Sequence, residues 1–238
     1  MEFPMRINKY IAHKGIASRR EADALIEKKQ VTINGKTAVL GDTVQEHDVV
    51  EVSTKNSAKK HYFAYYKGRG IITHSPGEGE TDIATKIATD YSLNDVYPVG
   101  RLDKDSEGLI ILTNDGRVTR ELLSPEHGHE RVYDVIVDKN VTGWTVKHLE
   151  EGVNIEGYTT KPAKAEKHPK NPKRFTLSLT EGKKHQIRRM CAALGYQVQT
   201  LKRVRIANIE LGKLKPNQYR KITGQELETF LNTLSIKK

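Results

Sequence analysis

The sequence predicts an α+β protein that consists of a small N-terminal unit followed by a larger domain. Beyond residue 60 the strand and helix patterns alternate irregularly, without the strict alternation of a doubly wound fold. No glycine-rich phosphate loop follows a first strand, as a dinucleotide-binding domain would require. We therefore expect residues 61–238 to form a mixed, mainly antiparallel sheet flanked by helices. Residues 1–53 form the small unit, and residues 54–60 are a linker.

The N-terminal unit shows the signals of two helices and a short sheet. Apolar residues within 7–11 share one helical face. Ser-Arg-Arg-Glu at 18–21 matches a capping box, which predicts a second helix that ends near Lys29. The segment 31–36 is typical of a strand that ends in an Asn-Gly turn, and 49–52 is a second strand. The residues that follow are polar and lack periodicity, which is why we interpret them as a linker.

The larger domain contains strand and helix patterns along its whole length. Apolar and β-branched runs predict strands at 62–66, 109–112, 132–137, 175–179 and 206–211. Helical periodicity predicts helices at 83–88, 118–123, 146–151, 184–194 and 226–234. Thr-Gly-Gln-Glu at 223–226 offers a second capping box. The single cysteine, Cys191, lies on the apolar side of its predicted helix, so we expect a core role and no disulfide.

Charge is concentrated in one part of the chain. The formal net charge is +10 and the sequence pI is about 9.5. Residues 183–221 hold 11 basic residues and one acidic residue, Glu210, and so account for the whole excess. This pattern predicts a basic surface that binds a polyanion. The longest apolar runs are too short for a membrane span and no signal peptide is evident, so we expect a cytoplasmic protein without a membrane partner.

The most informative stretch is residues 97–116. It places Asp103 between Arg101 and Lys104 in a glycine-flanked loop just before the predicted strand 109–112. A carboxylate that lies near a core and near cations can stay ionised while it loses water, which suits a nucleophile or a base. The alternative is a surface loop with solvated charges.

This stretch resembles the catalytic-aspartate motif of the bacterial ribosomal RNA pseudouridine synthases, with Gly-Arg-Leu-Asp followed by Ser-Glu-Gly-Leu-Ile-Ile-Leu-Thr-Asn-Asp-Gly. The resemblance implies that Asp103 is catalytic. Residues 130–137 resemble the motif that supplies the active-site tyrosine, here Tyr133. Residues 181–190 resemble a third motif, which implies that Arg188 lies within ion-pair distance of the aspartate. On the residue pattern alone, Tyr133 is interpreted as a core residue and Arg188 as a phosphate-binding residue.

Residues 6–52 resemble an S4 RNA-binding domain. Arg19 and Arg20 begin a predicted helix whose free amides favour phosphate, so the chemistry agrees with the resemblance. Arg101 is implied to fill the space that an extruded uridine leaves. The residues implied to bind RNA are Arg6, Lys9, Ser18, Arg19, Arg20, Arg101, Lys184 and Arg189.

The implied reaction converts uridine in RNA into pseudouridine. The base is detached at N1, turned within the pocket and rejoined to the ribose through C5. The reaction needs neither a redox change nor an energy source, so we expect no cofactor and no metal. Asp103 can attack the sugar, add to the pyrimidine ring or remove a ribose proton, and the sequence leaves these alternatives open. A glycosidase pair formed by Asp103 and Asp105 is a weaker hypothesis, because the basic segment indicates a polyanionic substrate.

The segments 123–127 and 184–186, together with the S4-like unit, resemble most the small-subunit branch of this family. We therefore expect a monomer that modifies one uridine of 16S ribosomal RNA. Two alternatives remain at this point: a uridine of 23S ribosomal RNA, or an RNA-binding assembly factor without catalysis. The assembly factor would not need Asp103, Tyr133 and Arg188 together.

Overall fold

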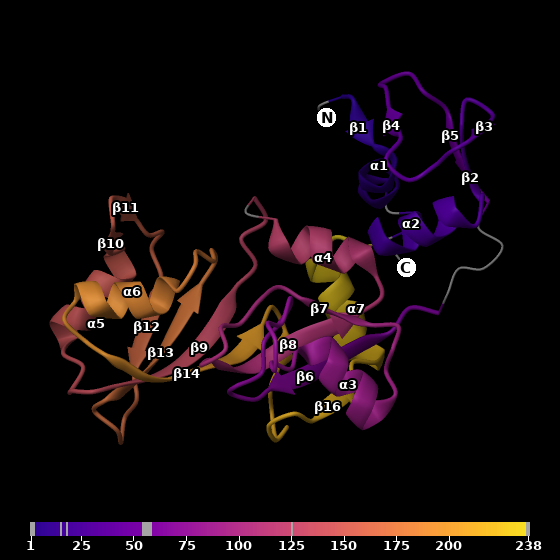
Figure 1. Ribbon diagram of the computed structural model, residues 1–238. Helices are drawn as coiled ribbons and strands as arrows, with labels where there is room; N and C mark the ends of the chain where they lie inside the picture. Colours follow the sequence, from indigo (N-terminus) through magenta and orange to yellow (C-terminus); the bar gives the residue numbers. More distant parts are fainter. Residues whose placement is uncertain (1–2, 15, 18, 54–58, 125, 237–238) are drawn as a thin grey trace.

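The computed structural model describes residues 3–14, 16–17, 19–53, 59–124 and 126–236. The predicted cap Ser18 and most of the predicted linker, residues 54–58, lie outside the described residues. Figure 1 shows the N-terminal unit, in indigo, beside a larger body built on one long sheet.

The N-terminal unit contains the helices and strands that its sequence predicts. Its elements are α1 (Ile7–His13), α2 (Arg19–Glu27), β1 (Met5–Arg6), β2 (Val31–Ile33), β3 (Lys36–Thr37), β4 (Thr43–Val44) and β5 (Val50–Val52). β2 pairs with β3 and β5, and β1 pairs with β4. Asn34 and Gly35 both have positive φ, as a tight hairpin turn between β2 and β3 requires. The buried core of the unit includes Ile7, Ile11, Ala22, Ile26 and Val31.

A nine-stranded sheet within the described residues forms the frame of the larger domain. The order of its main strands is β12 (Lys164–Lys167), β13 (Arg174–Leu179), β9 (Arg131–Val137), β14 (Val198–Ile206), β8 (Glu107–Thr113), β6 (Tyr62–Lys67) and β16 (Tyr219–Lys221). β7 (Tyr97–Val99) pairs with β8, and β15 (Ile209–Glu210) pairs with β14. Of these described pairings, β14 with β8 is parallel and the others are antiparallel, so the predicted mixed sheet is confirmed.

Helices cover the two halves of this sheet differently. In the half formed by β6 and β8, α3 (Ile83–Tyr91) packs on one face, whereas α4 (Gly116–Leu123) and α7 (Gly224–Thr233) pack on the other. β6 is consequently buried along its whole length. In the other half, α5 (Gly143–Glu151) and α6 (Gln186–Ala193) pack against β9 and β13. The hairpin of β10 (Asn154–Ile155) and β11 (Tyr158–Thr159) lies beside α6 (Figure 1).

The structure corrects two local predictions. The strand expected at 206–211 instead occupies Val198–Ile206, and the chain turns at Ala207, with φ of 48°, before β15. The capping box at 223–226 does not form: Thr223 makes no side-chain cap bond, and Glu226 accepts from Arg220 at 2.6 Å instead. Cys191 is buried as predicted, and burial raises the pKa of its thiol to about 12. No helix in the described part of the chain is long and apolar enough to cross a membrane.

Candidate active site

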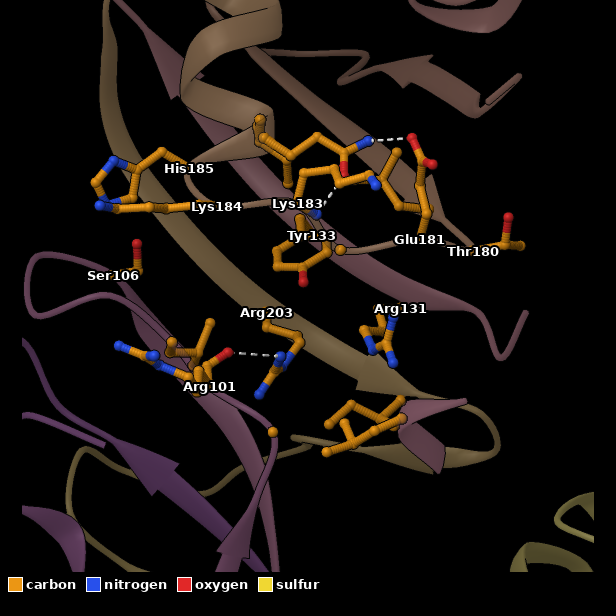
Figure 2. A pocket seen from close by; sticks show the side chains of 18 of the residues that line it. Arg101, Ser106, Arg131, Tyr133, Thr180, Glu181, Lys183, Lys184, His185 and Arg203 are labelled. Atoms are coloured by element: carbon orange, nitrogen blue, oxygen red, sulfur yellow. Dashed lines mark hydrogen bonds between the residues drawn. The ribbon is translucent and has the colours of Figure 1, made fainter. Parts of the chain in front are cut away.

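One cavity of about 750 Å³ brings together residues from the three sequence motifs. Asp103 reaches it from the loop between β7 and β8, and Tyr133 reaches it from β9. Arg101 and Lys184, both predicted to contact RNA, also line the cavity. Figure 2 shows Tyr133 between the segment 181–185 on one side and the Arg101 loop on the other. The fold therefore places two predicted catalytic side chains in one pocket.

Buried hydrogen bonds hold the loop that carries Asp103 in place. Leu102 is buried, and its N–H and C=O both bond the Thr73 hydroxyl, at 3.1 and 2.8 Å. The fully buried Lys67 ammonium donates to the carbonyls of Ser106, Gly68 and Lys104 at 2.8, 3.0 and 3.4 Å. Burial lowers the pKa of Lys67 to about 8, although nearby carboxylates, Asp103 first among them, act to raise it.

Lys67 was missed by the sequence analysis. The available signal was a lysine at the end of an otherwise apolar strand and just before Gly-Arg-Gly. A lysine in such a position is almost never fully buried unless it has partners, and here the partners are backbone carbonyls of the loop.

Asp103 pairs with a residue other than the expected one. His185 Nε2 lies 3.4 Å from Asp103 Oδ1, and His185 has a positive φ of 52° at the N-cap of α6. Arg188 forms no ion pair with Asp103 among the described residues. Its guanidinium instead faces the carbonyls of Val198 and Asp105 at 3.3 and 3.4 Å.

The expected Arg188–Asp103 ion pair is therefore not formed in this structure. The reason is geometric: Arg188 leaves α6 on the side that faces β14, so its guanidinium reaches the backbone behind the Asp103 loop and the Ser106 hydroxyl at 3.5 Å. Arg188 does not line the cavity, whereas His185 does. His185 belongs to the third motif, but no spacing rule indicated that it would turn toward the aspartate.

Two arginines flank Tyr133 on the same face of the sheet. Arg203 of β14 lies directly opposite Tyr133, and Arg131 precedes Tyr133 by two positions on β9. Both arginines line the cavity (Figure 2). Burial lowers the pKa of Arg131; the nearby Tyr133 acts to raise it, and the charge of Arg203 lowers it further. Neither arginine was singled out from the sequence, because basic residues in strands carry no local signal of burial.

The other described residues predicted to bind RNA lie outside the cavity. Arg6, Lys9 and Arg19 are exposed on the N-terminal unit. Arg20 stacks over the ring of Tyr97 at 4.9 Å, which brings the N-terminal unit against the strand that leads to Asp103. Arg189 is paired with Glu156 at 2.6 Å.

The basic segment 183–221 is partly neutralised by acidic residues from elsewhere in the chain. Pairs in the range of 2.5 to 3.9 Å join Arg189 to Glu156, Lys202 to Glu107, Arg205 to Glu130 and Arg220 to Glu226. Lys183 and Lys184 remain exposed, and both line the mouth of the cavity. The net charge of the segment therefore overstated the free positive surface. Lys213, Lys215 and Lys221 are also exposed but do not line the cavity, so only part of the remaining charge lies at the candidate site.

Comparisons with known proteins agree with this arrangement. The family model for RNA pseudouridylate synthase matches residues 61–193, and the model for the S4 domain matches residues 5–50. The dual-specificity RNA pseudouridine synthase RluF of Escherichia coli K12 is 40% identical over 94% of this chain and 77% of its own length. The ribosomal large subunit pseudouridine synthase B of Bacillus subtilis is 36% identical over 94% of each chain.

A solved structure described as a pseudouridylate synthase is similar over almost the whole chain. It has a TM-score of 0.70 and 30% sequence identity, and the match covers 95% of this chain and 99% of that one. The alternative of a non-catalytic assembly factor is set aside, because the relatives are named as enzymes. The chain belongs to the family of RNA pseudouridine synthases that carry an N-terminal S4 domain.

Proposed function

We propose that this enzyme converts a specific uridine of ribosomal RNA into pseudouridine, with Asp103 as the essential nucleophile or base and without a cofactor. The observation that carries the proposal is the convergence of Asp103 and Tyr133 on one cavity from separate elements. The aspartate side chain is 39% exposed and lies beside His185, so it is open to a nucleotide that enters the pocket. Tyr133 supplies a ring against which a pyrimidine can stack.

RNA reaches this pocket along basic residues at its rim. Lys183 and Lys184 lie at the mouth, and the exposed Arg6, Lys9 and Arg19 provide phosphate contacts from the S4 domain. In this proposal Arg101, exposed on the aspartate loop, takes the place of the extruded uridine in the RNA. The enzyme acts as a cytoplasmic monomer whose domains are residues 1–53 and 61–238.

The target subunit is the finer part of the proposal. Lys184 and His185 stand where large-subunit enzymes of the family tend to carry Asn-Arg, which favours a 16S uridine. The Bacillus relative is named for the large subunit, and this favours a 23S uridine as the second candidate. The two candidates share the same chemistry, so only the mapped position separates them.

The test is tritium release from [5-³H]uridine-labelled 16S and 23S transcripts, and from subunit particles, with the modified position mapped. Asp103→Asn keeps the size of the side chain and removes its charge, so we expect RNA binding to persist while release falls by at least about 1,000-fold. A thermal melt of the variant checks that the fold is intact. Wild-type enzyme that releases no tritium from either RNA or from the subunit particles, or an Asp103→Asn variant with full activity, would refute the proposal.

A further inference from the structure

The floor of the cavity contains an arginine that has an unused hydrogen-bond donor. Arg203 is only 3% exposed. Its Nε donates to the carbonyl of Leu109 at 2.7 Å, and Nη1 donates to the carbonyl of Arg101 at 3.3 Å. The second terminal nitrogen, Nη2, is buried and has no partner. A buried donor without a partner is costly, so this nitrogen is a candidate for contact with a ligand.

Neither of the two arginines beside Tyr133 is balanced by a carboxylate. Within the described residues, Arg203 forms no ion pair, and Arg131 donates only to the carbonyl of Leu122, at 2.9 Å. In contrast, Arg205 and Arg174 of the same sheet line a separate cavity and pair with Glu130 and Asp134 at 2.5 and 2.6 Å. The sheet thus neutralises its other partly buried arginines and leaves the two beside Tyr133 with uncompensated charge. Such charge favours a ligand that is negative or becomes negative.

The position of Arg203 indicates which part of a nucleotide it meets. Its guanidinium bonds the backbone of Arg101, two residues before Asp103, and it lies across the strands from Tyr133. The guanidinium is therefore held between the aspartate loop and the strand that carries Tyr133, where the proposed function places the uracil. A phosphate of the same nucleotide would remain at the exposed rim, near Lys183 and Lys184.

We propose that Arg203, assisted by Arg131, donates to the carbonyl oxygens of the bound uracil and stabilises the negative charge that the detached ring carries. When the C1′–N1 bond breaks, both of its electrons remain on the ring, and resonance places the charge on O2 and O4. C1′ is compensated in one of two ways. Either the Asp103 carboxylate bonds to it and is displaced when C5 attacks, or the electrons of the C2′–H bond are used, with Asp103 taking the C2′ proton and returning it to C2′ when C5 adds to C1′. When the ring rejoins through C5, the C5 proton is lost and N1 gains a proton, so the product is an isomer.

This inference rests on the proposed function and adds a catalytic role for Arg203, which lies outside the three motifs. Because two backbone carbonyls fix the guanidinium before substrate enters, little reorganisation is needed as charge develops. Loss of one such preorganised donor typically costs about 100-fold or more in rate.

The first test compares single-turnover tritium release and RNA affinity for wild type, Arg203→Gln, Arg203→Lys and Arg131→Gln. We expect release by Arg203→Gln to fall about 100-fold and RNA affinity to change by no more than about threefold. Arg205→Gln is the matched control, because it removes a cation from the same strand outside the cavity. Its activity should equal that of wild type.

The second test changes the substrate instead of the enzyme. Transcripts that contain 4-thiouridine or 2-thiouridine replace one carbonyl oxygen by sulfur, a weaker acceptor, and conversion is followed by nucleoside chromatography. The rate of conversion by wild type should fall on the RNA whose sulfur faces Arg203, whereas the rate of Arg203→Gln should fall little further on the same RNA. A purely structural role of Arg203 would not produce this coupling.

The possible outcomes separate the inference from the proposed function. Active wild type together with undiminished release by Arg203→Gln and Arg131→Gln overturns the inference and leaves the function intact. The inference is also overturned if, for both thio-substrates, sulfur slows Arg203→Gln by the same factor as it slows wild type. If Arg203→Gln does not melt cooperatively, the inference is judged on other measurements. These are the tritium release by Arg203→Lys and Arg131→Gln and the rate of wild type on the thio-substrates. Inactive wild type refutes the proposed function, and the inference fails with it.

Discussion

The substitution Gly108→Ala tests how closely the strand behind the aspartate loop approaches its neighbour. Gly108 has a φ of +113° and pairs with Arg203 where β8 and β14 run parallel. A Cβ at this position would lie 2.6 Å from the backbone nitrogen of Arg203 and 2.9 Å from its carbonyl carbon, with the carbonyl oxygen nearer still. These neighbours belong to the backbone of a central strand and cannot rotate away.

Two separate costs determine how far Gly108→Ala lowers the unfolding free energy. A side chain on a backbone with this φ costs about 1–3 kcal/mol in conformational strain. Forcing an extra methyl into a packed interior costs about another 1–3 kcal/mol. Because only movement of a whole strand can relieve the contact, we expect the upper part of both ranges, about 4–5 kcal/mol of unfolding free energy. That is a large share of the roughly 5–15 kcal/mol that stabilises a typical domain.

The assay is urea denaturation followed by far-UV circular dichroism, with two matched controls. Gly157 has a φ of +82° and no atom near a built Cβ, so Gly157→Ala should show only the strain, about 1–2 kcal/mol. Gly143 lies in the first turn of α5 with open space around it, so Gly143→Ala should be neutral or stabilising by up to about 1 kcal/mol. A Gly108→Ala variant as stable as Gly157→Ala and fully active would refute the reasoning.

Three further predictions concern a buried cation, a helix cap and the RNA-binding surface. The pKa of Lys67 is lowered in the fold, so the unfolded chain binds more protons than the native protein between about pH 8 and 10.5. The unfolding free energy of wild type, measured relative to Lys67→Met, should therefore rise across that range. Asp115 caps α4 and accepts hydrogen bonds from Arg117 and the Tyr62 hydroxyl. Burial acts to raise the pKa of Asp115, but these bonds lower it below its usual value. In urea melts, the stability advantage of wild type over Asp115→Asn should therefore disappear as pH falls below 3.8. Arg19→Ala should weaken RNA binding and reduce the salt dependence of log K in filter binding by about one unit, whereas an unchanged slope would exclude a phosphate contact.

The sequence alone predicted most elements of the fold, because their signals are local. Apolar and β-branched runs located β6, β8, β9 and β13, and helical periodicity located the five described helices of the larger domain within a few residues. The short strands β7, β10, β11, β12 and β16 were not predicted, nor was most of β14. The short strands are two to four residues long, and distant partners rather than their own propensity hold them in place.

The sequence also identified Asp103 and Tyr133, because each lies within a contiguous motif, and the fold brings both to one cavity. Only the tertiary structure decided the partners of these residues. It turned Arg188 toward the backbone behind the loop, placed His185 beside Asp103 and buried Lys67 beneath the loop. It also left Arg203 with a free donor next to Tyr133. These contacts join residues that are far apart in the chain. The hydrophobic pattern of a strand determines which of its faces is buried, but not which distant strand it pairs with.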